Sequence, residues 1–271
     1  MTAARLPLLV DPDVLDKSLG CEDILIVDLS THDNYRKLHV PGAVHLDYAQ
    51  IVALQKPVLG LLPDAGTLER LFGAAGIVAG THVVACDDEG GGRAARLLWT
   101  LETAGHSHYS LLNGGLHAWA NEGHRFESAV TVPSPGPFTV QHNEHAIARS
   151  DYILGRLHDD RVCLLDVRSP GEYHGVKKLA RRGGHIPGAV HLEWTQAIDT
   201  ARNLRLRPAA ELRAMLEAIG ATPQREVIVY CHSHHRSAHT WFVLKYLGYR
   251  DVRGYPGSWS DWGNNPSLPV E

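Results

Sequence analysis

The sequence lacks the features that would place it in several broad classes of protein. Its formal net charge at pH 7 is only −4, so neither nucleic acid nor an acidic membrane is implied as a partner. No apolar run reaches the roughly 18 residues that a membrane-spanning helix needs, and the first ten residues lack the apolar core of a signal peptide. The four cysteines show no CxxC spacing and no disulfide framework. We therefore expect a cytoplasmic protein with reduced thiols.

What the sequence does contain is an internal repeat with a period of about 140 residues. Four blocks recur in the same order in the two halves: 24–28 with 162–166, 39–46 with 185–192, 83–86 with 227–230, and 113–119 with 256–262. Four matched blocks in one order are hard to obtain by chance. The chain is therefore expected to be a duplicated domain.

Each copy alternates short apolar runs with helical patterns. In the second copy we predict strands at 162–166 and 227–230 and helices at 209–219 and from Ala238 onward. This alternation predicts an α/β fold, in which each domain is a parallel sheet flanked by helices. The proline-rich segment 130–137 cannot continue a helix or a central strand. We expect domains at 1–125 and 146–271, joined by a linker at 126–145.

Cys231 is the strongest candidate for a functional residue. It follows the apolar run 227–230 and opens the loop 231–237, which carries three histidines and Arg236 and leads into a helix. Ligands of such sheets bind beyond the carboxyl ends of the strands. Loop N–H groups and a helix N-terminus both favour a thiolate over a thiol. The pattern therefore indicates a nucleophilic cysteine in a cationic loop rather than a core residue.

The first copy has no cysteine at the equivalent position. When the repeats are aligned, Asp87 stands opposite Cys231, in an acidic, glycine-rich loop. Cys86 lies one position earlier, inside the predicted strand, and we expect it to be buried and inert. The first domain is therefore expected to be catalytically inactive.

The chain resembles the two-domain rhodanese (thiosulfate sulfurtransferase) family over nearly its whole length, and its loop is most similar to those of bacterial tandem rhodaneses. The resemblance rests on the blocks 166–173, 184–189, 231–237 and 257–262. It implies a catalytic C-terminal domain and a persulfide on Cys231. Sulfane sulfur would pass from thiosulfate to cyanide or another thiophilic acceptor with ping-pong kinetics. No metal or organic cofactor is needed, and we expect a monomer.

The residues predicted to form this site are grouped by role. We expect Cys231 to be the nucleophile and Arg236 to stabilise bound anions and the persulfide. The remaining residues are predicted to bind substrate: His232, Ser233, His234, His235, Ser237, Arg168 and Trp194. For His234 and His235 a structural or solvent-exposed role is an equal alternative. Arg168 can equally pair with a carboxylate and hold its loop, and Asp28 and Asp166 are expected to cap nearby backbone N–H groups.

Two other chemistries are less compatible with the loop. Phosphatase loops of the type Cys-x5-Arg close around a tetrahedral phosphate, whereas Arg236 is only five residues after Cys231. The smaller ring suits a sulfur atom. A metal site would need Cys231, His232, His234 and His235 to surround an ion from one short loop, and no second ligand cluster is apparent. We therefore predict no metal.

Two departures from the family concern the sulfur donor. Mammalian thiosulfate sulfurtransferases place a substrate-binding arginine where this chain has Glu172, and a lysine where it has Ser233. Thiosulfate is therefore expected to bind weakly or in another pose. This leaves open a sulfur-carrier protein that delivers sulfur from Cys231 to a protein partner. A purely structural tandem module is disfavoured by the cationic loop on one copy alone.

Overall fold

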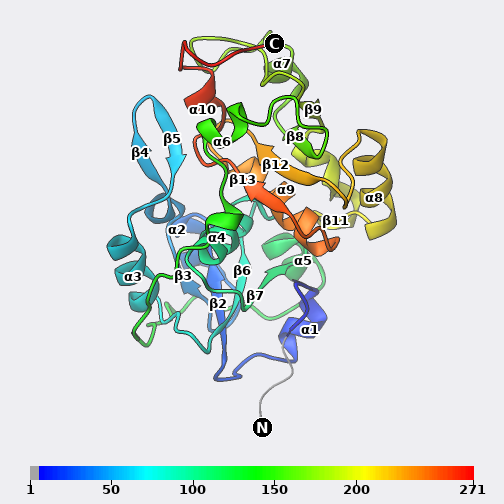
Figure 1. The fold of residues 1–271 in the computed structure, drawn as a ribbon. Helices are drawn as coiled ribbons and strands as arrows, with labels where there is room; N and C mark the ends of the chain where they lie inside the picture. Colours follow the sequence, from blue (N-terminus) through cyan, green and yellow to red (C-terminus); the bar gives the residue numbers. More distant parts are fainter. Residues whose placement is uncertain (1–5) are drawn as a thin grey trace. The chain divides into compact units, whose positions relative to one another are not determined.

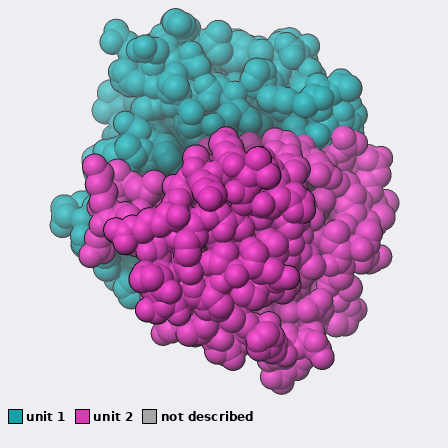
Figure 2. All heavy atoms as spheres, turned by 90° about the horizontal axis from the view of Figure 1, so that it is seen from above, with its two compact units in different colours: residues 1–51, 63–142, 198–206 teal, residues 52–62, 143–197, 207–271 magenta. Residues whose placement is uncertain are grey.

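The computed structural model describes residues 6–271. The chain divides into two compact units, and each also takes a segment from the other half of the sequence (Figures 1 and 2). Unit 1 contains residues 1–51, 63–142 and 198–206, and unit 2 contains residues 52–62, 143–197 and 207–271. Among residues 6–271, no helix is long and apolar enough to cross a membrane.

Unit 1 is built on a parallel five-stranded sheet with the strand order β1-β7-β6-β2-β3. Its sheet strands are β1 (Leu9–Val10), β2 (Ile24–Asp28), β3 (Val44–His45), β6 (His82–Cys86) and β7 (Tyr109–Leu112). Its helices are α1 (Pro12–Asp16), α2 (His32–Lys37), η1 (Tyr48–Ile51), α3 (Ala65–Ala74), α4 (Gly92–Thr103), α5 (Gly115–Asn121) and η4 (Thr200–Arg202). A two-stranded antiparallel ribbon, β10 (Ile198–Asp199) and β11 (Arg205–Leu206), completes the unit.

Unit 2 repeats this plan with a parallel four-stranded sheet in the order β13-β12-β8-β9. Its sheet strands are β8 (Val162–Asp166), β9 (Val190–His191), β12 (Glu226–Tyr230) and β13 (Val252–Gly254). Its helices are η2 (Glu144–Ala146), α6 (Ser150–Leu154), α7 (Pro170–Tyr173), η3 (Trp194–Ala197), α8 (Ala209–Ala218), α9 (Arg236–Tyr246) and α10 (Ser258–Trp262). The antiparallel hairpin β4 (Ala53–Gln55) and β5 (Val58–Leu61) belongs to this unit, and β5 lies beside α10 (Figure 1).

The predicted α/β fold with parallel sheets is confirmed. Strand β8 has the predicted bounds, while β12 begins one residue earlier than predicted and α9 begins at Arg236 rather than Ala238. The linker 126–145 contains no regular element before the short helix η2, and its Gly136 N–H donates to Gly73 O over 3.0 Å within unit 1. The linker backbone, which pairs with no strand at this point, is thus hydrogen-bonded to α3.

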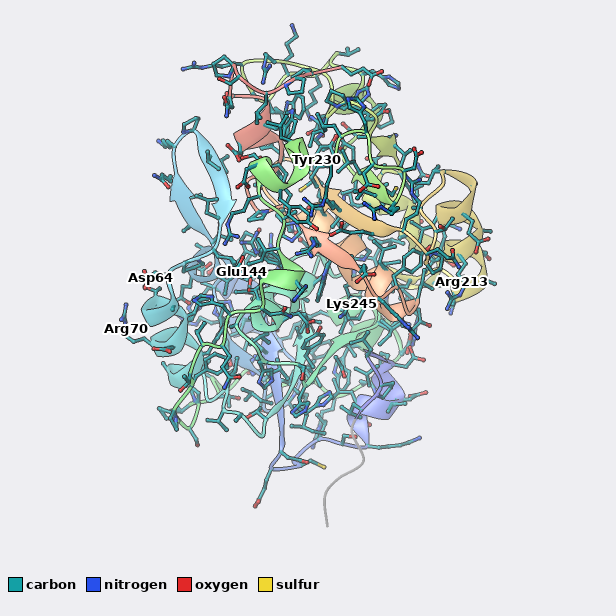
Figure 3. All side chains as sticks on the ribbon, viewed as in Figure 1. Asp64, Arg70, Glu144, Arg213, Tyr230 and Lys245 are labelled. Atoms are coloured by element: carbon teal, nitrogen blue, oxygen red, sulfur yellow. The ribbon has the colours of Figure 1, made fainter. Side chains whose placement is uncertain are left out.

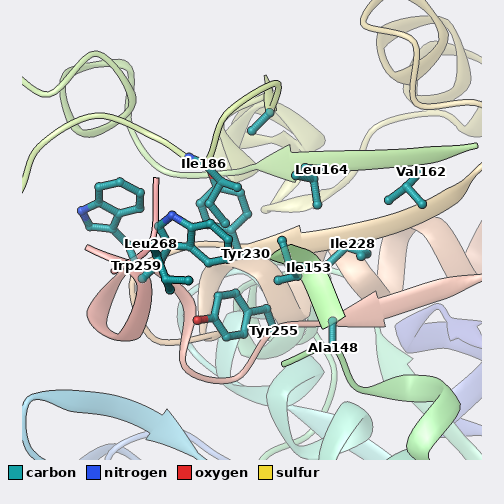
Figure 4. Packing of buried hydrophobic residues seen from close by; sticks show 12 residues of the cluster. Ala148, Ile153, Val162, Leu164, Ile186, Ile228, Tyr230, Tyr255, Trp259 and Leu268 are labelled. Carbon is teal, nitrogen blue, oxygen red and sulfur yellow. The ribbon is translucent and has the colours of Figure 1, made fainter. Parts of the chain in front are cut away.

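The core of unit 2 packs around the carboxyl end of β12. Tyr230, the last residue of β12, is fully buried among Ile186, Tyr255 and Trp259 (Figure 4). Its hydroxyl accepts the N–H of Ile186 over 3.1 Å. Large rings packed at native density leave little freedom for the residue that follows them in the chain.

Candidate active site

Cys231 lies directly after β12, beyond the carboxyl end of the strand, as predicted (Tyr230, which precedes it, is labelled in Figure 3). It is 1% exposed. Its N–H donates to Ser258 Oγ over 3.2 Å, and its carbonyl accepts the N–H of Trp259 over 3.0 Å. The carbonyl of His232 likewise accepts the N–H of Ser260 over 3.0 Å. Two backbone N–H groups of helix α10 therefore bind the first two carbonyls of the loop.

The thiol is surrounded by groups that favour its ionised form. Burial alone would raise its pKa. The charge of Arg236, the hydroxyl of Ser237 at 3.4 Å from Sγ, and the backbone N–H groups of Ser237 and Ser233 outweigh burial, and the pKa of Cys231 is lowered. A thiolate stabilised by a fixed cation and convergent hydrogen bonds is the nucleophilic state of cysteine.

Arg236 is held by Glu172 in a bidentate ion pair. Its Nη1 and Nη2 donate to the two carboxylate oxygens over 2.8 and 2.9 Å. Glu172 is itself positioned by a capping box at the start of α7, where its Oε2 accepts from Ser169 Oγ over 2.9 Å. Burial opposes ionisation of Glu172, but Arg236 and Ser169 dominate and lower its pKa to about 2. The pair fixes the guanidinium and cancels part of its charge.

The three loop histidines differ in their surroundings. His234 is fully buried with φ +53°, and its Nδ1 lies 2.7 Å from Ser237 Oγ, so it orients the hydroxyl that contacts Sγ. His232 is half-buried, and its pKa is lowered chiefly by that burial, which favours the neutral ring. The ring of His235 lies 6.3 Å from that of Trp194. Substrate binding by these histidines and by Trp194 stays a prediction.

Trp194 begins the short helix η3 and is half-buried beside α9. Its ring meets His239 edge-on with 5.3 Å between centroids. A small apolar pocket lies beside it, lined in part by Leu192, Met215 and Val243. Trp259, whose N–H binds the Cys231 carbonyl, lies nearer to the nucleophile than Trp194, whose ring is 6.3 Å from that of His235.

Arg168 is placed differently from the prediction that it binds substrate. Its side chain is 2% exposed and forms a buried ion pair with Asp166, with a shortest N–O distance of 2.5 Å. It also donates to Gly184 O over 2.7 Å and lies 4.4 Å from the ring centre of Trp259. These contacts argue against substrate binding, because Nε and Nη2 of Arg168 are already bonded within the fold. The alternative of a carboxylate-paired arginine fits the structure.

Sequence reasoning missed two supports of the loop. Ser258 accepts the N–H of Cys231, and Ser260 binds the hairpin residue Leu59 through its hydroxyl, with Leu59 N–H donating over 2.8 Å. The repeat alignment of 256–262 with 113–119 was a signal for the importance of α10. No local sequence pattern predicted the contact with the hairpin, which is far from Ser260 in the sequence.

Within residues 6–271, no three His, Cys, Asp or Glu side chains are grouped so that they could hold a metal ion. The cysteines Cys21, Cys86, Cys163 and Cys231 are free thiols. Burial raises the pKa of Cys163 to about 11, and burial together with nearby Asp28, Asp87 and Asp88 raises that of Cys86 well above its usual value. Of the three buried thiols, Cys231 is the one whose pKa is lowered.

Comparison with known protein families agrees with this geometry. The model of the rhodanese-like domain matches the chain twice, at residues 11–122 and 150–265. The chain belongs to the rhodanese-like family.

Three relatives match the chain over most of their own length. The chain is 43% identical over 266 residues to a thiosulfate sulfurtransferase of Pseudomonas aeruginosa, covering 98% of this chain and 97% of the relative. It is 42% identical over 268 residues to a thiosulfate sulfurtransferase of Azotobacter vinelandii, covering 99% and 98%. It is also 34% identical over 262 residues to the sulfur carrier protein TtuD of Thermus thermophilus, covering 92% and 88%.

Solved structures show the same fold. The anaerobic ergothioneine biosynthesis enzyme of Chlorobium limicola matches with a TM-score of 0.88 at 22% identity, covering 97% of this chain and 70% of that one. At this identity the likeness concerns the fold alone.

The loop of the first rhodanese-like domain binds a carboxylate of its own. Asp87 follows β6 as Cys231 follows β12, which confirms the predicted equivalence, and it is fully buried. Its Oδ1 accepts the N–H groups of Glu89 and Gly91 over 3.1 and 2.8 Å, and its Oδ2 accepts that of Ala94 over 2.9 Å. The donors that could bind an external anion are therefore occupied from within the chain.

Proposed function

We propose that this protein is a thiosulfate sulfurtransferase whose nucleophile is Cys231. The observation that carries the proposal is the convergence of Arg236, Ser237 and loop N–H groups on a thiol with a lowered pKa. The relatives named thiosulfate sulfurtransferase, at 42% and 43% identity over nearly the whole chain, support the choice of substrate.

The reaction has two displacements. The Cys231 thiolate attacks the outer sulfur of thiosulfate, the sulfur–sulfur bond of thiosulfate breaks, and sulfite leaves with the bonding electron pair. Cys231 is then a persulfide. A thiophilic acceptor such as cyanide attacks the terminal sulfur, forms thiocyanate and returns the thiolate, so the kinetics are ping-pong. No electrons are supplied from outside in either step.

The loop residues have distinct parts in this proposal. The N–H groups of Ser233 and Ser237 and the hydroxyl of Ser237 stabilise the charge on sulfur, with Arg236 as the fixed cation. His232 and His235 line the loop as candidate substrate contacts, and His234 acts through Ser237. The catalytic part is assigned to residues 146–271, with 1–125 as the inactive domain and 126–145 as the connection. The free thiols are compatible with a monomer in a reducing cytoplasm.

A second candidate is a persulfide carrier that delivers sulfur to a protein partner. Two observations favour it: the ion pair of Arg236 with Glu172 removes positive charge that a thiosulfate dianion would need, and a relative at 34% identity is named a sulfur carrier protein. In this case Cys231 would hold its persulfide until the acceptor protein docks.

Intact-protein mass spectrometry separates these candidates. Thiosulfate is expected to add one sulfur atom to the wild-type protein, and cyanide is expected to remove it with the formation of thiocyanate. A stable adduct with negligible turnover toward cyanide supports the carrier instead. An adduct that persists in Cys231→Ala, or no adduct at all, contradicts both.

A further inference from the structure

The hairpin β4–β5 comes from the first half of the sequence, yet within unit 2 it contacts the Cys231 loop. Gly60, in β5, is buried with φ +80°, and a Cβ built on it would lie 2.0 Å from Ser233 O and 2.9 Å from Pro256 O. A real Cβ cannot approach a backbone oxygen so closely. Glycine is therefore required here both by the backbone conformation and by the space.

We propose that Gly60 is a positioning residue for Cys231: its bare backbone fixes the Ser233 carbonyl and thereby aims the loop donors at the sulfur. The inference rests on the proposed function, because it concerns the reactivity of the same thiol. It means that the first half of the chain contributes directly to the active loop of the second.

The peptide that Gly60 contacts lies between two groups that influence the hydrogen bonds to the Cys231 sulfur. Ser233 carries on one side of its Cα the N–H that binds Sγ, and on the other the carbonyl that faces Gly60. The next residue, His234, has φ +53°, a conformation that a non-glycine residue keeps only when its surroundings hold it. The His234 ring in turn lies 2.7 Å from Ser237 Oγ. Displacement of Ser233 together with the 233–234 peptide would thus disturb two of the donors to Sγ.

The hairpin is itself anchored to the helix that supports the loop. Ser260 Oγ accepts the Leu59 N–H over 2.8 Å, and the Ser260 N–H donates to His232 O over 3.0 Å. Leu59, the neighbour of Gly60, is thus hydrogen-bonded to α10. Because α10 also binds the loop, this bond fixes the position of Gly60 relative to the loop. Gly60 thus contacts the carbonyl of Ser233, and N–H groups of α10 bind the two preceding carbonyls of the loop.

The test is the pH dependence of alkylation of Cys231 by iodoacetamide, followed on its own peptide by mass spectrometry. In Gly60→Ala the rate at about pH 6 is expected to fall at least about tenfold, because roughly one hydrogen bond to a charged sulfur is lost. At a pH above the ordinary range of thiols the two rates are expected to agree within about twofold, since every thiol is then ionised. A uniform loss at all pH values would indicate blocked access and would overturn the proposal, as would an unchanged profile.

Gly248→Ala is the matched control, because Gly248 has φ +85° in the same unit and no atom within 4 Å of a built Cβ. It is expected to keep the wild-type profile, and an equal shift there would make the effect one of general backbone strain. If Gly60→Ala does not fold, Ser260→Ala decides, because it frees Leu59 without adding atoms. Its rate at about pH 6 is expected to fall about threefold, and an unchanged profile would overturn the proposal. Failure of the wild-type protein to take sulfur from thiosulfate would refute the proposed function. The alkylation experiment could still be interpreted, because it uses no thiosulfate.

Discussion

The two loops that follow β6 and β12 are built alike and differ in what they surround. Each lies between a buried parallel strand and a long helix. The first turn of each helix carries an arginine paired with a carboxylate: Arg236 with Glu172, and Arg93 with Asp88 and Glu89. In the second loop the donors converge on a sulfur atom. In the first they converge on the carboxylate of Asp87. The comparison teaches that a copy without the cysteine can keep its loop by supplying its own anion.

The largest effect is expected from the sulfur itself. Cys231→Ala should lower the turnover of thiosulfate and cyanide on the order of 10⁴-fold or more, because no other group supplies the covalent step. Cys163→Ala is the matched control, since that thiol is buried in β8 and its pKa is raised to about 11. Steady-state production of thiocyanate measures both. Comparable losses in the two variants would show that the loss in Cys231→Ala does not come from removal of the nucleophile.

The next largest effect concerns the cation beside the sulfur. Arg236→Met is expected to slow sulfur uptake from thiosulfate about 10- to 100-fold at neutral pH, because the thiolate loses a fixed positive charge. It should also lower the free energy of unfolding by about 2 kcal/mol, since Glu172 is left buried and unpaired.

The double variant Arg236→Met with Glu172→Gln separates these two effects. It is expected to recover most of the stability, because the unpaired charge is gone, and little of the rate of sulfur uptake. Stopped-flow kinetics and urea unfolding give the two quantities. Recovery of the rate along with the stability would show that Arg236 serves the fold and not the thiolate.

The stability of the protein in acid tests the same ion pair through the ionisation of Glu172. The pKa of Glu172 is about 2 in the folded protein and 4.5 in its ordinary state. Because the folded value is the lower one, the stabilisation is present above about pH 4.5 and is lost as the pH falls toward about 2. Wild type is expected to lose about 2 kcal/mol more than Glu172→Gln over this interval, measured by urea unfolding at several pH values. Parallel curves for the two proteins would contradict this.

How far the sequence predicted these features depends on whether local or distant residues determine them. The strands β8 and β12 are runs of buried apolar residues bounded by polar ones, so local pattern identifies them. The equivalence of Asp87 and Cys231 followed from the repeat in the same way. Asp28 and Asp166 indeed accept backbone N–H groups two residues on, at 2.7 and 3.0 Å.

The rest depended on packing between segments that are far apart in the chain. The sequence left open whether Arg168 binds substrate or pairs with a carboxylate, and nothing near it in the chain shows that it also donates to Gly184 O. The contact of Gly60 with Ser233 joins a hairpin of the first half to a loop of the second. Helix α9 begins at Arg236, two residues before the predicted start, because polar loop residues such as Arg236 and Ser237 are used in its first turn.

The smallest expected effect is the one that tests the comparison most directly. Asp87→Cys places a thiol at the position equivalent to Cys231, and in a Cys231→Ala background it is expected to take up no sulfur from thiosulfate. A thiol there would lie near Asp28 and Asp88, the carboxylates that already raise the pKa of Cys86 next to it. Such a thiol stays protonated at neutral pH, and the neighbouring carboxylates repel the thiosulfate dianion.

In an otherwise wild-type chain, Asp87→Cys should leave turnover within about twofold, because Cys231 keeps all of its partners in unit 2. Mass spectrometry of the intact protein after incubation with thiosulfate reads out both backgrounds. A sulfur adduct at position 87 would mean that the loop needs only a nucleophile, and that its acidic neighbours do not matter. No adduct, followed by an adduct once Asp88→His and Glu89→Ser are added, would locate the difference between the two loops in their charge.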